Sequence, residues 1–394
     1  MVAVPVPMGG MLTMNSRERL VKALNHEEPD RVPFDLGASL ITGIHKIAYQ
    51  NVLKYMGIKE EEIPIFDVVQ QLAAPSEHFL QRINVDTRNL SPKNSSKWQL
   101  QFEDDDHYRY FTDEWGIVWR MPLGHGLYFD MYKNPLADVE DVREIDKYTF
   151  PDPDDDNRYL GLRERALELY EQGYAIVMSS ISAGIMELGA WLRGFENFYM
   201  DLVLRPELIS RILDKALEIK IKYWSRVLEQ VGDLIQVVQE ADDLGTQNSL
   251  LISPEMYRKL IKPRHKELFG FIHSKTKAAI FIHCCGAIYE LIPDLIEVGV
   301  DILNPVQFTA KNMEATKLKR EFGTDIVFWG GGVDTQNILP HGTPQQVKDS
   351  VRRQIEILAP GGGFVFNTVH NIQPDVPPEN FVAMLEALEE YGKY

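Results

Sequence analysis

Short β-branched or apolar segments alternate with longer amphipathic segments along most of this chain, and that alternation constrains the fold more than any other feature. It is typical of repeated βα units, in which helical crossovers connect parallel strands, and not of hairpins. Eight such units close a barrel. The eight candidate strands are Val32–Asp35, Val85–Leu90, Tyr174–Ser180, Leu234–Glu240, Ala278–His283, Val300–Val306, Asp325–Gly331 and Phe364–Val369. The sequence therefore predicts an α/β protein with a (β/α)₈, or TIM-barrel, fold.

Two segments depart from this repeat. Asn15 and Glu18 have the spacing of a capping box, which predicts a helical extension before the first strand. Residues 97–148 carry aromatic side chains at a period of two, which predicts an inserted antiparallel segment, and we expect it to cover the barrel mouth. The length of 394 residues would suit two or three domains, but barrels of this class reach that size alone. We expect a single domain over residues 1–394.

Charge and composition exclude several classes of function. The net charge of −17 repels a phosphate backbone, and no basic patch offsets it, so we expect no nucleic-acid partner. No apolar stretch reaches the ~18 residues that a membrane helix needs, and the first 14 residues lack the pattern of a signal peptide. We therefore expect a cytoplasmic protein without a membrane partner. The two cysteines, Cys284 and Cys285, are adjacent and are predicted to be reduced thiols.

Polar side chains gather at the predicted carboxyl ends of the strands, where barrel enzymes hold their active sites. Among them, Glu240, Asp242 and Asp243 are the candidates for orienting a substrate. Any one polar strand end is weak evidence, but their convergence on one face of a barrel predicts a site. The set comprises Asp35, Asp86, Ser179, Ser180, Glu240, Asp242, Asp243, His283, Cys285, Asn304, Gln307, Asp334, Asn367 and His370.

The sharpest local pattern is His283-Cys284-Cys285 at the end of an apolar strand. In an H-x-C pattern both outer side chains can turn toward one ion, and zinc favours such a nitrogen and sulfur set. His370, just after the eighth strand, is the candidate third ligand, and three ligands with an open position are typical of catalytic zinc. Glu240, Gln307 or water could take the fourth place. The alternative is a buried histidine beside a small apolar cysteine, with no metal.

Two glycine-rich segments, 329–332 and 360–363, lack the G-x-G-x-x-G spacing of a dinucleotide fold. We interpret them as places where the backbone comes close to a flat or bulky group.

Four segments of the chain carry a pattern typical of one superfamily: Glu18–Asp35, Asp242–Tyr257, His283–Gln307 and Trp329–Gln336. They resemble the uroporphyrinogen decarboxylase superfamily, and the likeness covers nearly the whole chain except its N-terminal tip and most of the aromatic insertion. The superfamily has two branches on a (β/α)₈ barrel. The decarboxylases use no metal and hold a tetrapyrrole with early arginines and a nearby aspartate. The other branch comprises zinc methyltransferases that exchange a methyl group with a corrinoid protein and carry H-x-C and a later cysteine.

His283 and Cys285 match the H-x-C part of the methyltransferase pattern. His370 stands where the later cysteine is expected, and Gln307 stands where some members use a glutamate. Asp86 is the candidate for the aspartate of the decarboxylases, but residues 33–42 contain none of the arginines that clamp the tetrapyrrole. A chain this acidic would hold a polyanion poorly without them. The methyltransferase branch is the better match.

The resemblance implies zinc and a corrinoid, carried on a partner protein, as cofactors. One thiolate with two neutral imidazoles leaves zinc a net positive charge, which favours polarising a donor over activating a thiol. We expect methyl transfer from a small methylated donor, a methyl ether or similar, to the corrinoid cobalt. The macrocycle is expected at Gly331, Gly332, Asp334 and Asn367. The alternatives are a decarboxylase acting on a tetrapyrrole and a non-catalytic barrel that binds a corrinoid.

Overall fold

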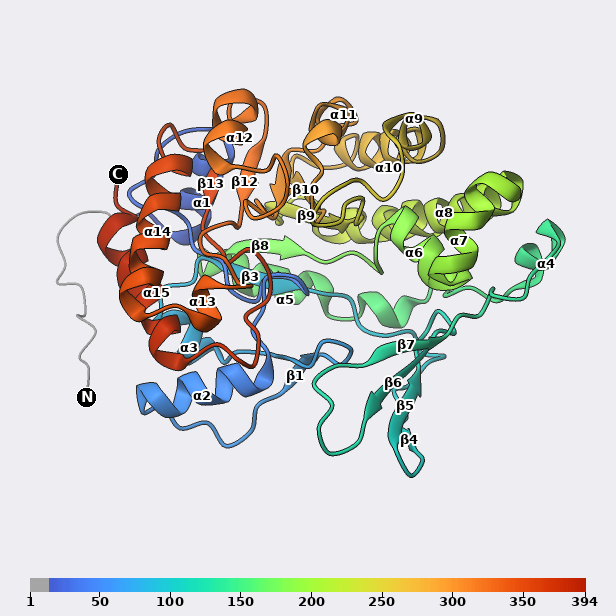
Figure 1. The fold of residues 1–394 in the computed structure, drawn as a ribbon, viewed down its shortest axis with the longest axis horizontal. Coiled ribbons are helices and arrows are strands. Elements are labelled where there is room, and N and C mark those ends of the chain that lie inside the picture. The colour runs from blue at the N-terminus through green and yellow to red at the C-terminus, as the bar shows by residue number, and fades with distance from the viewer. Residues whose placement is uncertain (1–13) are drawn as a thin grey trace.

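The computed structural model describes residues 14–394 and contains one curled sheet of seven parallel strands (Figure 1). The strands stand in the order β13-β12-β11-β10-β9-β8-β3. Within this sheet, each strand therefore pairs with the sheet strand that comes before or after it along the chain. This order is that of a TIM-type barrel. The strands are β3 (Thr87–Leu90), β8 (Ala175–Met178), β9 (Val237–Ala241), β10 (Ala279–His283), β11 (Ile302–Asn304), β12 (Val327–Trp329) and β13 (Phe364–Val365).

Residues 33–35 close the ring, although they form a single bridge and not a strand. Phe34 pairs in parallel with Phe366, just after β13. The amide of Asp35 donates to the Phe366 carbonyl at 2.9 Å, and the carbonyl of Phe34 accepts from the Asp86 amide at 2.8 Å. The prediction of a first strand at Val32–Asp35 is therefore wrong, because these residues form no strand. They nevertheless occupy the eighth position of the ring, between β13 and β3. Pro33 explains part of this, since proline has no amide to add to a ladder.

Helices surround the sheet and connect its strands (Figure 1). The predicted capping box is confirmed, because the side chain of Asn15 accepts from the Glu18 amide while Glu18 reaches back to the amide of Asn15. The helices are α1 (Ser16–Leu24), α2 (Lys46–Met56), α3 (Glu77–Arg82), α4 (Val142–Lys147), α5 (Leu162–Glu171), α6 (Ile185–Arg193), α7 (Phe195–Leu204), α8 (Pro206–Val231), α9 (Pro254–Met256), α10 (Lys262–His273), α11 (Ile292–Glu297), α12 (Ala315–Phe322), α13 (Ile338–His341), α14 (Pro344–Leu358) and α15 (Pro378–Tyr391).

The barrel interior is a separate small cluster of buried apolar side chains. Alternate residues of the strands point into it, because successive side chains on a strand face opposite sides. Leu20 of α1 joins this cluster and is fully buried, so the helical extension is part of the barrel core. The cluster comprises Leu20, Ala38, Ala175, Val177, Val237, Phe281, Ile302, Val327, Trp329 and Val365.

The predicted antiparallel insertion is present as a four-stranded sheet in the order β4-β5-β6-β7, which projects beside the barrel (Figure 1). Phe111, Trp119 and Phe129 are buried on one face of it, whereas the segment 98–102, which has the same aromatic pattern, is not a strand. Trp119 packs edge-on against Trp191 of α6 with ring centroids 5.5 Å apart. That the insertion covers the mouth stays a prediction, as does the single domain. Its strands are β4 (Glu103–Asp104), β5 (Tyr108–Thr112), β6 (Val118–Pro122) and β7 (Asp130–Lys133), and a hairpin of β1 (Ile65–Asp67) and β2 (Leu72–Ala73) precedes it.

Seven of the eight predicted strands are confirmed, each shorter than its predicted segment by one to four residues. Six of them lie within the predicted bounds, whereas β9 ends at Ala241, one residue after the predicted end at Glu240. Among residues 14–394, no helix is both long and apolar enough to cross a membrane.

Replacing Leu20 with Ala tests whether α1 belongs to the barrel core. Because Leu20 is fully buried in the interior cluster, the variant should lose about 2–5 kcal/mol of unfolding free energy, measured by urea titration. The neighbouring Val21 is 40% exposed on the same helix, and Val21→Ala should stay within about 0.5 kcal/mol. Equal losses in the two variants would place α1 outside the core.

Candidate metal centre

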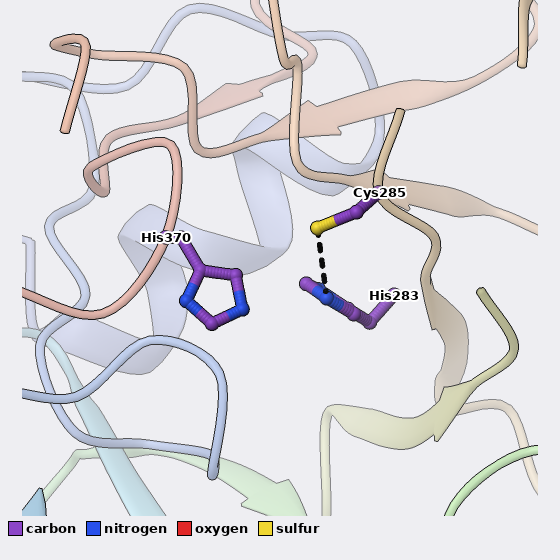
Figure 2. A group of neighbouring side chains, drawn as sticks. All are labelled: His283, Cys285 and His370. Atoms are coloured by element: carbon purple, nitrogen blue, oxygen red, sulfur yellow. Dashed lines mark hydrogen bonds between the residues drawn. The ribbon is translucent and has the colours of Figure 1, made fainter. Parts of the chain in front are cut away.

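His283, Cys285 and His370 meet at the carboxyl ends of the barrel strands. Each offers one nitrogen or sulfur atom, and these three atoms all lie within 4.8 Å of one another. Figure 2 shows the two histidine rings and the Cys285 sulfur turned toward a common point. The structure thus brings together all three side chains that the sequence predicted as zinc ligands.

Strand alternation accounts for this meeting. His283 is the last residue of β10 and stands in register with Ala241 of β9, two positions beyond Phe281, which lies in the barrel interior. His283 and Cys285 share the inward side, whereas the side chain of Cys284 is fully buried and its sulfur accepts from the Leu244 amide at 3.3 Å. The two free thiols therefore face different surroundings.

The donor set fits zinc. The Cys285 Sγ and the His283 Nε2 are 3.3 Å apart. A tetrahedral zinc with Zn–N near ~2.0 Å and Zn–S near ~2.3 Å separates such a pair of ligand atoms by about 3.5 Å. The two rings cross at 69° with centroids 5.3 Å apart, which leaves a nitrogen of each ring free to approach one centre. Three ligands drawn from two strand ends leave a fourth position open.

Burial favours the neutral forms of His370 and Cys285. Desolvation, with a smaller effect of the nearby His283, lowers the pKa of His370 to about 3, so its imidazole is unprotonated at neutral pH. Desolvation, together with the carboxylates of Asp243 and Glu187, raises the pKa of Cys285 well above its usual value. The thiol therefore holds its proton until a cation compensates the charge of the thiolate.

Asp243 is the predicted carboxylate that reaches this group. Its Oδ1 accepts from the Cys285 amide at 2.8 Å and lies 3.8 Å from the His283 Nε2. The side chain of Asp243 is 38% exposed, so it faces both the ligands and the solvent of the mouth. Burial and the charges of Asp243 and Asp242 also raise the pKa of Glu187, in the first turn of α6, well above its usual value. Asp243 and Glu187 thus form an acidic side of the site.

Glu240 does not join the site, contrary to its predicted role as a substrate-orienting carboxylate or fourth ligand. It stands in register with Ile282 and faces the helices, one residue out of phase with His283. There its oxygens accept from the Lys220 Nζ at 2.7 Å, the Trp224 indole at 2.6 Å and the Ser180 hydroxyl. The pair of Lys220 and Glu240 is buried between β9 and α8. Glu240 is therefore a structural residue.

Asp242 is likewise occupied elsewhere. Its carboxylate accepts from the amides of Met186 and Glu187 at the start of α6, and it lies 2.9 Å from the His265 Nε2. A carboxylate at the N-terminus of a helix accepts hydrogen bonds from the first amides, which have no partner within the helix. Asp242 therefore anchors α6, which carries Glu187, and does not itself face the metal group.

Gln307 is also occupied. Its Oε1 accepts from the Gly286 amide at 2.7 Å, and its Nε2 donates to Gln247. Of the three predicted candidates for the fourth position, Glu240 and Gln307 are thus committed to other partners. Solvent, a substrate atom or the nearby Asp243 is left to fill it.

The residues predicted to contact a flat cofactor have their own structural reasons. A Cβ on Gly331 would lie 2.7 Å from the Val306 Cβ, and one on Gly332 would lie 2.3 Å from the ring of Phe366, so internal packing requires both glycines. Asp334 accepts from the amides of Gln336 and Asn337 within its own turn. Asn367 donates to the Asp35 carbonyl, while its buried Oδ1 has no partner among the described residues. Only Asn367 keeps an unused polar atom.

Asp86 lies at the opposite end of the barrel from the metal group, because it precedes β3 whereas His283 ends β10. Arg19 and Arg31 each lie 2.7 Å from its carboxylate, which is fully buried. The position proposed for a decarboxylase aspartate is thus a structural ion pair.

Asn304 belongs to the polar strand ends, but the sequence predicted no partner for it. Its Oδ1 lies 2.6 Å from the Nδ1 of His283. The inward phase of β11 would have indicated it.

Similarity to known proteins covers most of the chain. The family described as Uroporphyrinogen decarboxylase (URO-D) matches residues 108–391. The chain belongs to the uroporphyrinogen decarboxylase family. This confirms the predicted resemblance. The chain is an enzyme of a superfamily that includes decarboxylases and methyltransferases.

Individual relatives of this family member carry both names. A uroporphyrinogen decarboxylase from Pseudoalteromonas translucida is 26% identical over 286 residues, 68% of this chain and 75% of that protein. A methylcobamide:CoM methyltransferase from Methanosarcina barkeri is 24% identical over 211 residues, 53% of this chain and 56% of that one. The solved structure of a methyltransferase from Methanosarcina mazei covers 96% of this chain and 99% of its own, with 17% identity and a TM-score of 0.63. That structure supports the fold.

Replacing Glu240 with Ala separates a structural role from a role in the site. The variant leaves Lys220 buried without its partner, which should cost about 3–5 kcal/mol of unfolding free energy in urea titrations. In zinc titrations, the folded variant should match the wild type. The double variant Lys220→Met, Glu240→Leu removes both charges and should recover much of the loss. A loss of zinc at unchanged stability would return Glu240 to the site.

Proposed function

We propose that this member of the family is a zinc-dependent methyltransferase that moves a methyl group from a small methylated donor to the cobalt of a corrinoid protein. The observation that carries the proposal is the group of His283, Cys285 and His370, whose ligand atoms lie within 4.8 Å at the barrel mouth. Three nitrogen and sulfur ligands with an open fourth position are typical of catalytic zinc.

The donor set supports the demethylating direction. The imidazoles of His283 and His370 are neutral ligands, so Cys285 alone would carry a negative charge and the centre would keep a net positive charge. When bound there, zinc supplies a Lewis acid that polarises the heteroatom of a methyl ether or similar donor. Asp243, 3.8 Å from the His283 Nε2, stands where it can hold the polar end of that donor or a water molecule.

Corrinoid chemistry is supported by the name of one relative, the methylcobamide:CoM methyltransferase, which matches about half of this chain. We propose a corrinoid protein as partner and the barrel mouth as the place where the methyl group changes hands. Asn367 is the predicted cofactor contact whose side-chain oxygen, Oδ1, has no hydrogen-bond partner within residues 14–394. The reduced thiols of Cys284 and Cys285 fit a cytoplasmic location, since reducing compartments preserve such ligands.

A metal-free decarboxylase is the second candidate, because several relatives carry that name. Two observations weigh against it. Asp86, the candidate aspartate, is neutralised by Arg19 and Arg31 at the far end of the barrel. The segment after Phe34 that reaches the mouth, residues 36–42, contains no arginine to hold a polycarboxylate. A non-catalytic barrel that binds a corrinoid is the third candidate, and it would need no metal group.

The metal is tested first. Protein purified without chelators should hold about one zinc per chain, measured by elemental analysis. Cys285→Ser and His370→Ala should each lose most of it. Cys284→Ser is the matched control, because the neighbouring thiol bonds to the Leu244 amide and not to the group, and it should keep its zinc. Full zinc occupancy in either ligand variant would remove that residue from the site.

The reaction is tested next. The enzyme is given a reduced corrinoid protein and a methoxylated aromatic compound or comparable donor. It should form the methylcorrinoid, measured as a loss of the cobalt(I) absorbance. Chelation should abolish the reaction, because the donor's heteroatom is a poor leaving group until a Lewis acid takes up its developing charge. Uroporphyrinogen should be turned over slowly or not at all. Efficient decarboxylation of that tetrapyrrole in the presence of a chelator would contradict the proposal.

A further inference from the structure

The side-chain amide of Asn304 lies between a metal-ligand candidate and the wall of the barrel. Its Nδ2 donates to the backbone carbonyl of Trp329 at 2.9 Å, and its Oδ1 lies 2.6 Å from the Nδ1 of His283. A carbonyl can only accept, so the amide nitrogen must face Trp329 and the amide oxygen must face His283. Both residues are almost fully buried, so no solvent competes for these bonds.

This orientation decides which nitrogen of His283 carries the proton. An amide oxygen only accepts, so the Nδ1 of a neutral His283 must be protonated to make the 2.6 Å bond. The Nε2 then keeps its lone pair. That nitrogen faces the Cys285 Sγ at 3.3 Å, toward the point where the three candidate ligands converge. In the other tautomer, the Nε2–H would point at that centre and block it.

The carbonyl that orients Asn304 is itself held by the barrel core. The Trp329 indole donates to the Asp35 Oδ2 at 2.9 Å and meets the ring of Phe281 edge-on, with centroids 5.4 Å apart. Trp329 is 1% exposed and belongs to the interior cluster. A run of hydrogen bonds therefore leads from Asp35 through Trp329 and Asn304 to His283.

We propose that Asn304 is a positioning residue that fixes the tautomer and ring orientation of His283 for metal binding. The inference rests on the proposed metal centre for its purpose, but the tautomer itself is a property of the metal-free protein. Hydrogen bonds to the second nitrogen of a ligand histidine commonly change metal affinity by ~10–100-fold. The alternative is that Asn304 merely fills space in the barrel.

The tautomer is measured in metal-free wild-type protein labelled with ¹⁵N-histidine, by NMR correlations from ring protons to both ring nitrogens. His283→Gln identifies the signals by their loss. We expect His283 to have a protonated Nδ1 and an unprotonated Nε2. A neutral His283 with its proton on Nε2 would overturn the proposal, and this result needs only the wild-type protein and the assignment variant.

Variants then test the link to the metal, by competition for zinc against a chelator of known affinity. Asn304→Leu should weaken zinc binding by about 10–100-fold. Asn304→Asp keeps an acceptor for the His283 Nδ1–H, so it should keep the wild-type tautomer and bind zinc more tightly than the Leu variant. Asn89→Leu is the control. The side-chain amide of this half-buried residue of β3 donates to the Ala38 carbonyl and the Ser179 hydroxyl and makes no hydrogen bond to His283, so the variant should bind zinc as the wild type does.

The outcomes separate the two proposals. Unchanged affinity in Asn304→Leu, or equal losses in Asn304→Leu, Asn304→Asp and Asn89→Leu, would reduce Asn304 to a packing residue. A wild-type protein with the expected tautomer but no affinity for zinc would overturn the proposed function and leave the tautomer assignment standing.

Discussion

The strict alternation of side chains along a ring of paired parallel strands decides where each polar group of this molecule acts. Phe281 and His283 follow one another on the inward side of β10, the first in the apolar core and the second in the metal group. Glu240, in register with the residue between them, faces the helices and pairs with Lys220. A single step along a strand thus separates a candidate metal ligand from a buried structural charge.

The same rule explains how much could be predicted. Strand positions follow from apolar segments between helices, and H-x-C at a strand end places two ligands on one side, so most of the barrel and the His283, Cys285 and His370 group follow from the sequence. Glu240 lies at the same strand end but one residue out of phase with His283, so its place in the chain does not by itself predict which side of the sheet it faces. The glycine-rich segment predicts a bulky ligand, but packing within the protein explains Gly331 and Gly332, because Val306 and Phe366 leave no room there for a side chain.

Other parts could not be predicted because their partners are far away in the chain. Asp242 is bound by His265 and by the first turn of α6, three segments that only the folded barrel brings together. The orientation of Asn304 depends on a backbone carbonyl of the next strand. No periodicity or spacing reports such contacts, since they depend on how neighbouring strands are staggered. For that reason the meeting of His283, Cys285 and His370 is easier to predict from the sequence than the contacts that hold these side chains in place.

The ring closes at a seam where residues 33–35 and β13 share only a short ladder, with Phe34 and Phe366 as the single bridged pair. Few hydrogen bonds must break for the barrel to open there, so local unfolding should begin at this seam. His370 follows β13 by a few residues, whereas His283 and Cys285 belong to the middle of the sheet. Any ion or ligand that these three side chains share ties the last strand back to the centre of the ring. Occupancy of the mouth is therefore linked to closure of the seam, and the exchange rate of the Asp35 and Phe366 amide hydrogens becomes a gauge of both.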